Sequence, residues 1–198
     1  MAMVPPPQAA EPPVILVVGD SLSAGYGLGA GQGWVALLEQ RLTREGYGYR
    51  VVNASVSGET TDGGLARLSR ALERHAPAIV VIALGGNDGL RGLPVVRVRG
   101  NLEAMIDRSR AAGAGVVLVG IRIPTNYGPR YRSAFEGIYA DLVRRYRIGH
   151  VPFILQDVAL RTDLFQADGI HPNAAAQPLL LARVWPELQP LLRQPPGP

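Results

Sequence analysis

The sequence predicts a single domain of three layers, α/β/α, in which helices cover both faces of a central parallel sheet of about five strands. Apolar runs alternate with amphipathic stretches along the whole chain, which is typical of repeated strand–helix units. The apolar runs are continuous in Val, Ile and Leu, as expected for strands that are buried on both faces. A length of 198 residues, with 47% hydrophobic and 18% charged residues, suits one domain with a sizeable core.

The first elements follow from local patterns near the start of the chain. A β-branched run over 14–18 ends at Gly19 and predicts the first strand. Apolar residues at helical spacing predict a helix over 34–42, with Gly46 as its stop signal. A second strand is expected over 50–56.

The middle of the chain repeats the same alternation. A helix is expected over 62–74 and is closed by Pro77. A continuous apolar strand follows over 78–84. The next helix is expected over 95–112, where Gly113 ends it.

The last elements complete five strand–helix units. A fourth strand is expected over 115–121, and a fourth helix over 131–147 ends before Gly149. A brief fifth strand is expected over 152–155, and a final helix over 173–192 is interrupted by prolines. Such units predict right-handed crossovers and a ligand site beyond the carboxyl ends of the strands.

The chain ends are expected to lie outside this domain. A Pro/Ala-rich stretch over 1–13 predicts a disordered lead-in, the domain itself spans 14–192, and residues 193–198 form a tail. The lead-in lacks the apolar core of a signal peptide. Because no apolar run approaches the ~20 residues that cross a bilayer, we expect no stable membrane insertion.

The amino-acid composition excludes several kinds of catalytic chemistry and argues against a nucleic-acid partner. The chain has no Cys, and all 20 of its basic residues are Arg. A Cys nucleophile, a thiolate metal site and a Schiff-base lysine are therefore excluded. The net charge of +4 comes from scattered arginines without a run of five like charges. This pattern favours solvated helix faces, so we expect no nucleic-acid partner.

Polar residues follow the predicted strands at the points where the sheet should end. Ser21 follows the first strand, Asn87 the third, and Asp168 and His171 the fifth. In a parallel sheet these loops meet at one edge. His171 can act as the base that a Ser21 hydroxyl nucleophile needs, and Asp168 can accept the imidazole Nδ1–H. Their joint arrangement indicates a serine hydrolase site, whereas each residue alone is more often structural.

Acyl transfer also needs hydrogen-bond donors for the oxyanion that develops on the carbonyl. The backbone N–H groups of Ser21 and Gly58 and the side-chain amide of Asn87 could supply three. Gly58 has no Cβ, so a substrate can approach its backbone closely.

Other polar motifs are better explained as structural. Asp20 is expected to accept a hydrogen bond that fixes its loop, and Asp88 to tie the turn at Asn87. Asp168 and His171 lack a third ligand at metal-binding spacing. The glycine pattern over 25–30 begins too far after the first strand for a dinucleotide site. We therefore expect neither a metal nor a cofactor.

Several short motifs occur in a fixed order along the chain. They are GDSLSAGYG at 19–27, SGET at 57–60, GGNDGLRG at 85–92, IPTNYG at 123–128 and DGIHP at 168–172. From about residue 14 to residue 192 the chain resembles the SGNH subgroup of GDSL-type serine esterases and lipases. It is most similar to the bacterial branch of thioesterase I, arylesterase and lysophospholipase. Ala83 departs from that pattern, because an acidic residue is expected before LGGND.

The resemblance implies a flavodoxin-like fold and a set of roles for these residues. It implies that Ser21 is the nucleophile, His171 the base and Asp168 the acid that orients it. Ser21, Gly58 and Asn87 would form the oxyanion hole. It further implies hydrolysis of medium or long acyl esters and thioesters, with aryl esters accepted, through an acyl-enzyme and without a cofactor.

Substrate selection is expected to involve two loops that flank the site. Both mix apolar residues with Gly and Pro, and they could line an acyl groove or only pack as loops. The candidate groove residues are Leu90, Leu93, Ile123, Pro124 and Tyr127.

Two other functions remain open from the sequence. One is a carbohydrate or peptidoglycan O-acetyl esterase of the same superfamily, which would favour small acetyl groups. The other is a lipid- or sugar-binding module, which should lack a triad residue, and none is missing here. The resemblance also implies a periplasmic or secreted protein, and a monomer is the default expectation.

Overall fold

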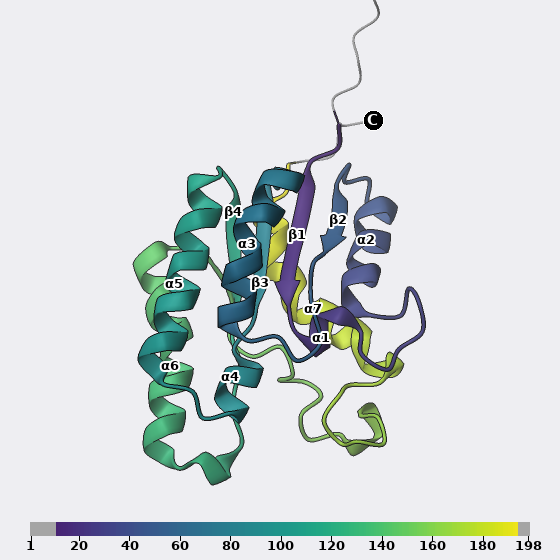
Figure 1. Ribbon diagram of the computed structural model, residues 1–198. Helices are drawn as coiled ribbons and strands as arrows, with labels where there is room; N and C mark the ends of the chain where they lie inside the picture. The colour runs from purple at the N-terminus through teal and green to yellow at the C-terminus, as the bar shows by residue number, and fades with distance from the viewer. Residues whose placement is uncertain (1–10, 194–198) are drawn as a thin grey trace, which may run out of the picture.

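Five parallel strands form the central sheet of the computed structural model, which describes residues 11–193 (Figure 1). The strands are β1 (Val14–Gly19), β2 (Arg50–Asn53), β3 (Ile79–Ala83), β4 (Gly115–Val119) and β5 (Gly149–Val151). Their order in the sheet is β2-β1-β3-β4-β5, so β1, β3 and β4 are flanked on both sides. The predicted α/β/α fold with a five-stranded parallel sheet is confirmed.

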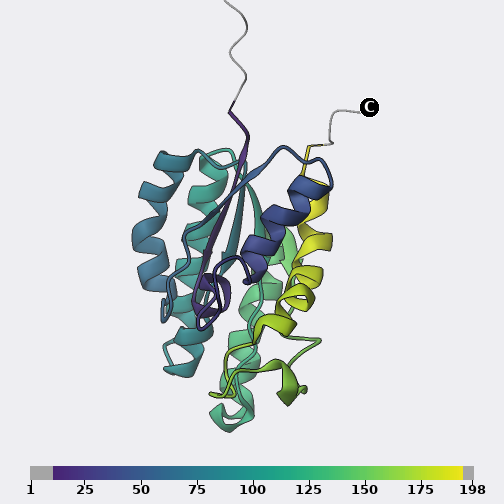
Figure 2. The same ribbon diagram turned by 90° about the vertical axis from the view of Figure 1, so that its right-hand side faces the viewer.

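Helices cover both faces of this sheet (Figures 1 and 2). The α-helices are α1 (Ser21–Ala24), α2 (Trp34–Arg44), α3 (Thr61–His75), α4 (Gly86–Leu90), α5 (Val95–Ala111), α6 (Pro129–Tyr146) and α7 (Gln177–Leu188). Short 3-10 helices occur at Thr125–Tyr127, Thr162–Leu164, Ala174–Ala176 and Gln189–Leu191. α2 and α7 pack on one face of the sheet, and α3, α5 and α6 pack on the other.

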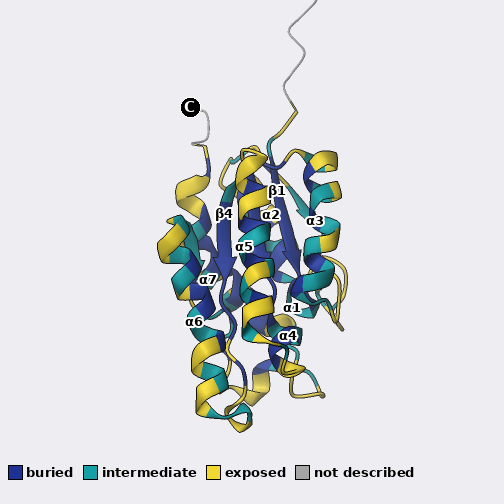
Figure 3. Ribbon diagram, turned by 60° about the vertical axis from the view of Figure 1, so that its left-hand side comes forward, coloured by how far each residue is buried: buried dark blue, intermediate teal, exposed yellow. Residues whose placement is uncertain are grey.

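The sheet separates two hydrophobic cores, because successive side chains of a strand point to opposite faces. In β1, Ile15 packs against α2 and α7, whereas Leu16 packs against α3, α5 and α6. Figure 3 shows the buried strands between helices whose outer faces are exposed. Ala83, where the resemblance leads one to expect an acidic residue, is buried in the core formed with α2 and α7.

The carboxyl ends of the strands meet at one end of the domain. β1 ends at Gly19, two residues before Ser21, and β3 ends at Ala83, shortly before α4 begins at Gly86. The loops that follow β2, β4 and β5 lie at this same end (Figure 1). The topology therefore places the predicted functional residues side by side.

The fifth strand is not where the sequence suggested. It spans Gly149–Val151 and pairs with β4, instead of covering 152–155. Pro152 has no N–H to give to a sheet, which explains why pairing stops before it. Val151 O still accepts a hydrogen bond from Gly120 N at 2.7 Å. Residues 152–155 instead leave the sheet at its carboxyl end.

The second strand is shorter than predicted and ends at Asn53 instead of residue 56. The Asn53 side chain accepts a hydrogen bond from Ser55 N at 3.1 Å and donates one to Ser23 O at 2.7 Å. Beyond Asn53 the chain still runs beside β1, because Ala54 N donates to Val17 O at 2.8 Å and Val56 N donates to Gly19 O at 3.0 Å. The remaining expected boundaries differ by a few residues, and the short helices α1 and α4 were not predicted.

The predicted lead-in and tail lie mostly outside the described residues. Residues 1–10 and 194–198 are not described, whereas residues 11–13 have no regular secondary structure and 11 and 12 are exposed. Within residues 11–193, none of the helices combines the length and the apolar character that crossing a bilayer requires.

Candidate active site

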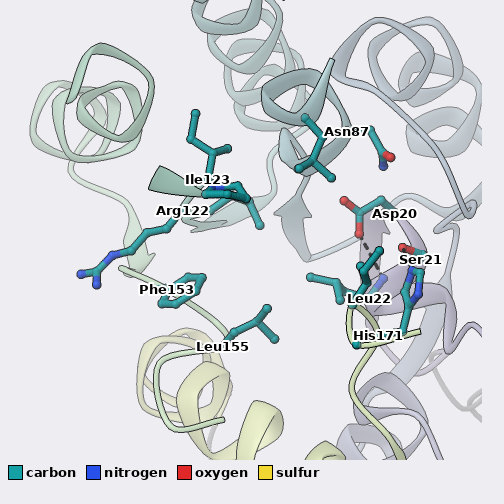
Figure 4. A pocket seen from close by; sticks show the side chains of 15 residues that line it. Asp20, Ser21, Leu22, Asn87, Arg122, Ile123, Phe153, Leu155 and His171 are labelled. Atoms are coloured by element: carbon teal, nitrogen blue, oxygen red, sulfur yellow. Dashed lines mark hydrogen bonds between the residues drawn. The ribbon is translucent and has the colours of Figure 1, made fainter. Parts of the chain in front are cut away.

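Ser21, His171 and Asp168 form a continuous chain of hydrogen-bonding groups at the carboxyl end of the sheet. His171 Nε2 lies 3.0 Å from Ser21 Oγ, and His171 Nδ1 lies 2.6 Å from Asp168 Oδ2. Figure 4 shows the imidazole directly beside the serine. Ser21 is the first residue of α1, directly after β1, and the other two residues come from the segment before α7. Residues 150 positions apart are thus joined by the fold.

The carboxylate of Asp168 is fixed by its own turn. Its Oδ1 accepts hydrogen bonds from Ile170 N at 2.9 Å and from His171 N at 3.0 Å. These bonds, led by those from His171, lower the pKa of Asp168 to about 2. Gly169 has φ +66°, which permits the tight turn. Asp168 is therefore ionised at neutral pH and aimed at the imidazole.

The first helix holds Ser21 at its amino terminus. Asp20 caps this helix, because its Oδ1 accepts the Leu22 N–H at 3.1 Å, as predicted. Asp20 is only 3% exposed, and burial raises the pKa of its carboxyl to about 6. The Ser21 N–H is at the first helical position, where the backbone has no partner within the helix. It is thus free to donate toward the cavity.

The turn that carries Asn87 depends on Gly85. Gly85 has φ +118°, and a Cβ there would collide with the hydroxyl of Tyr139, which donates to Leu84 O at 2.9 Å. Asn87 Nδ2 donates to Glu59 O at 3.0 Å, which leaves one amide hydrogen for a ligand. This hydrogen bond therefore holds the Asn87 side chain against the loop after β2.

Asp88 ties this turn to α3 instead of bonding within its own loop. Its carboxylate accepts hydrogen bonds from Thr61 N at 3.0 Å and from Thr61 Oγ1 at 2.5 Å. Both side chains are buried. The bond explains how α4 is held against the start of α3.

Gly58 is the one predicted oxyanion residue that does not line the cavity at Ser21. It lies in an exposed turn with φ +80°, and its carbonyl accepts a hydrogen bond from Arg91 Nη2 at 3.1 Å. An added Cβ would meet nothing within 4 Å, so its backbone is open to approach. Ser21 and Asn87 do line the cavity (Figure 4).

A cavity of about 560 Å³ opens beside Ser21. Three of the predicted groove residues, Leu90, Ile123 and Pro124, are in its wall. Leu93 and Tyr127 are not. Leu93 packs toward the core under α5 and α6, and the Tyr127 hydroxyl donates to Leu90 O at 2.6 Å. These two residues lie outside the wall of this cavity, and their role in substrate binding stays a prediction.

Several wall residues were missed by sequence reasoning. The cavity is also lined by Leu22, Ile121, Arg122, Phe153, Leu155 and Ile170. Phe153 and Leu155 had been assigned to the fifth strand. Pro152 is the sequence feature that could have indicated that the strand ends before these residues and that they belong to a loop at the site.

A further contact unites the two loops that carry Ser21 and His171. Gln166 Nε2 donates to Tyr26 O at 2.7 Å and to Pro172 O at 3.2 Å. The Tyr26 ring packs on the His171 imidazole with centroids 4.5 Å apart. Neither Gln166 nor Tyr26 was identified from the sequence.

The described residues contain no group of three His, Cys, Asp or Glu side chains that could hold a metal ion. A serine hydroxyl, an imidazole and a carboxylate in series, beside an apolar cavity at the end of a parallel sheet, define the class of serine hydrolases. The chemistry that such an arrangement performs is acyl transfer to the hydroxyl.

Comparison with known proteins gives the family. The model of the GDSL-like Lipase/Acylhydrolase family matches residues 17–178, and this chain belongs to that family. It is 54% identical to Esterase TesA of Pseudomonas aeruginosa, over 97% of this chain and 96% of the relative. It is 42% identical to Thioesterase 1/protease 1/lysophospholipase L1 of Escherichia coli K12, over 93% and 88%.

A solved structure shares the same architecture. The psychrotrophic esterase EstA from Pseudoalteromonas, inhibited by monoethylphosphonate, superposes with a TM-score of 0.85 at 42% identity, covering 89% of this chain and 97% of that one. The protein is an esterase of the GDSL family that acts as a serine hydrolase.

Proposed function

We propose that this esterase cleaves acyl esters and thioesters through an acyl-enzyme on Ser21. The observation that carries this proposal is the hydrogen-bonded series Ser21–His171–Asp168 beside an apolar cavity. The cavity provides room for an acyl chain, and the series provides an activated hydroxyl.

In the first half-reaction His171 Nε2 accepts the Ser21 Oγ proton while Oγ bonds to the carbonyl carbon. Asp168 accepts the Nδ1–H and stabilises the imidazolium that forms. The tetrahedral intermediate then expels the alcohol or thiol, which takes the proton from Nε2. In the second half-reaction water gives its proton to Nε2, attacks the acyl carbon and releases the carboxylic acid and the Ser21 hydroxyl.

The oxyanion is stabilised by donors on two elements. Ser21 and Asn87 line the cavity, and the Ser21 N–H and the second amide hydrogen of Asn87 are two of the donors. The Gly58 N–H is the third. Gly58 does not line the cavity, so its turn must approach the substrate for that bond to form. The loss of one donor typically costs about 10²–10³ in rate.

The substrate class follows from the cavity wall and from the relatives. The wall is dominated by Leu, Ile, Phe and Pro side chains, which suits a hydrocarbon chain better than a sugar. The Escherichia coli relative carries thioesterase and lysophospholipase in its name, which supports thioesters and lysophospholipids as substrates here. Aryl esters follow from the resemblance alone.

A chain-length panel tests this substrate class. p-Nitrophenyl esters from acetyl to palmitoyl should give a kcat/KM that rises to a maximum at a medium or long chain. The value of kcat/KM at this maximum should fall for Leu155→Asp, which places a charge in the cavity wall. It should stay unchanged for Leu93→Ala, because Leu93 lies outside that wall. A maximum at acetyl would instead support the O-acetyl esterase.

A periplasmic or secreted location and a monomeric state stay predictions. Cell fractionation checks the first, and size-exclusion chromatography with light scattering checks the second.

A further inference from the structure

The large apolar side chains that are exposed gather at the end of the domain that carries the site. Of the seven in the described residues, six lie at the carboxyl end of the sheet or in the first turn of α5. They are Tyr26, Val56, Leu90, Val96, Leu160 and Ile170. Leu160 is 97% exposed and Val96 is 77% exposed. The seventh, Leu191, lies beside Gly115 at the opposite end.

The same end carries unpaired positive charge. Arg91, Arg122 and Arg130 are exposed there, and within residues 11–193 none of the three forms an ion pair. The Arg122 guanidinium lies over the Phe153 ring, 5.2 Å from its centroid, and Figure 4 shows it directed away from Ser21.

Carboxylates at this end are either in contact with a partner side chain or buried. The pairs are Glu59–Arg67, Asp62–Arg97, Asp157–Arg183, Asp163–Arg161 and Asp168–His171. Asp20 and Asp88 are buried. Within the described residues, Arg91, Arg122 and Arg130 are therefore exposed cations that no carboxylate pairs with. We name the six apolar residues together with Arg91, Arg122 and Arg130 the docking face.

The docking face shares three residues with the wall of the cavity. Leu90, Arg122 and Ile170 are cavity wall residues as well as exposed ones. Arg91 is bonded to Gly58 O, which joins the loops after β3 and β2. Exposed apolar residues mixed with cations are the composition of surfaces that rest on anionic lipid. A nucleic acid would use the arginines but would leave Leu160 and Val96 in water.

We propose that the docking face binds the surface of anionic phospholipid bilayers or micelles, with the cavity mouth toward the lipid. Val96 and Leu160 would insert among the headgroups and acyl chains, and the arginines would pair with lipid phosphates. An acyl ester could then pass from the lipid to Ser21 without crossing bulk water. Binding is peripheral and reversible, because a few side chains are inserted and no helix is.

Diether lipids allow binding to be measured apart from catalysis, since they contain no carboxylic ester. The wild-type chain and Ser21→Ala should both co-sediment with vesicles of diether phosphatidylglycerol at low salt. Both should bind vesicles of diether phosphatidylcholine at least tenfold more weakly. Salt at 0.5 M should weaken the binding to phosphatidylglycerol, because it screens the arginines. Failure of Ser21 as nucleophile would leave these results unchanged.

Variants away from the catalytic residues and cavity wall localise the binding. Leu160→Asp and Val96→Asp should each reduce vesicle partitioning by about tenfold, and Arg130→Gln by about fivefold. All three should keep the wild-type kcat/KM on a short, water-soluble ester. The matched controls at the other end, Leu191→Asp and Arg44→Gln, should partition like the wild type.

Three results would overturn the proposal. They are equal binding to phosphatidylcholine and phosphatidylglycerol, no binding to either, and an effect of Leu191→Asp as large as that of Leu160→Asp. Loss of short-ester activity in Leu160→Asp together with lost binding would indicate misfolding of that variant. Val96→Asp, on a separate element, then decides the outcome.

Discussion

The side-chain amide of Asn87 donates one hydrogen bond to Glu59 O, and its second hydrogen is available to a ligand. Because an oxyanion forms only as the carbonyl is attacked, that second bond should act in the transition state. We expect Asn87→Ala to lower kcat by about 10²–10³ with little change in KM. Steady-state kinetics on a p-nitrophenyl ester measure both constants.

Asn101 offers a matched control for this change. Its amide donates to Thr61 Oγ1 and Asp62, away from the cavity. Asn101→Ala should reduce thermal stability while kcat stays within about twofold of wild type. A rise in KM with unchanged kcat in Asn87→Ala would assign Asn87 to ground-state binding.

Asp20 should make folding stability depend on pH. Burial raises its pKa from 3.8 to about 6 in the folded protein, so between these values the folded state holds more proton than the unfolded state. Stability is unaffected below about pH 4, falls as the pH rises to 6, and carries the full cost above that. The cost is roughly 3 kcal/mol.

Asp20→Asn removes this titration while its amide oxygen can still cap α1. Denaturant unfolding at several pH values should show the variant gaining on wild type as the pH rises from 4 to 7. Asp62→Asn is the control of opposite sign, since hydrogen bonds from Asn101 and Arg97 lower the pKa of Asp62. A pH-independent difference for Asp20→Asn would show that the buried carboxyl does not titrate in this range.

At the residue scale, the sequence identified the functional residues that a strand end or a motif marks. Ser21 and Asn87 closely follow buried strands, so the parallel topology places them at the same end of the sheet. Asp168 and His171 lie far beyond β5, and the DGIHP motif marked them in the sequence. Gln166 has no such marker, because its role depends on the path of a long irregular segment. Tyr127 lies near the site in sequence order, yet its hydroxyl turns to Leu90 O.

Among the elements, the side chain of Gln166 hydrogen-bonds the segment after α1 to the segment that bears His171. Gln166→Ala removes the hydrogen bonds to Tyr26 O and Pro172 O, so the imidazole should be held less firmly against Ser21. Misalignment of reacting groups slows chemistry more than binding. We expect kcat to fall by about tenfold with a small change in KM and in the melting temperature.

Gln40→Ala is the control for Gln166→Ala, because Gln40 Nε2 donates to Gly31 O on the exposed surface. Its kinetics should match wild type. An unchanged kcat in a Gln166→Ala variant with the circular dichroism spectrum of a folded protein would show that the Gln166 hydrogen bonds do not position the imidazole.

The elements themselves were predictable where local pattern decides them. Long helices and buried strands have strong periodicity, so their positions were correct within a few residues. β5 was misplaced because Gly149–Val151 is too short for a pattern and the apolar run beyond Pro152 looked stronger. α1 and α4 were missed because each is four or five residues long and depends on a cap or a glycine.

For the whole molecule, the sheet divides the interior into two cores that share no helix. Leu38 on α2 and Leu102 on α5 are fully buried in different cores. Each change to Ala should destabilise the fold by about 2–5 kcal/mol. Because the sites share no helix and face opposite sides of the sheet, the double variant should equal their sum within about 0.5 kcal/mol in denaturant unfolding.

A marked departure from additivity would mean that the sheet transmits strain between the cores. The layer architecture was the most predictable feature of the molecule, since it follows from the alternation of apolar runs with amphipathic helices. The shape of the cavity was not, because it is built by loops whose side chains have no periodic arrangement.

Covalent labelling of Ser21 tests the central claim most directly. The protein is treated with a p-nitrophenyl alkylphosphonate, digested, and its peptides are weighed by mass spectrometry. We expect one phosphonyl group on the Ser21 hydroxyl, loss of esterase activity in proportion to labelling, and no label on folded Ser21→Ala. Stoichiometric labelling at another residue, or wild-type turnover by folded Ser21→Ala, would contradict it.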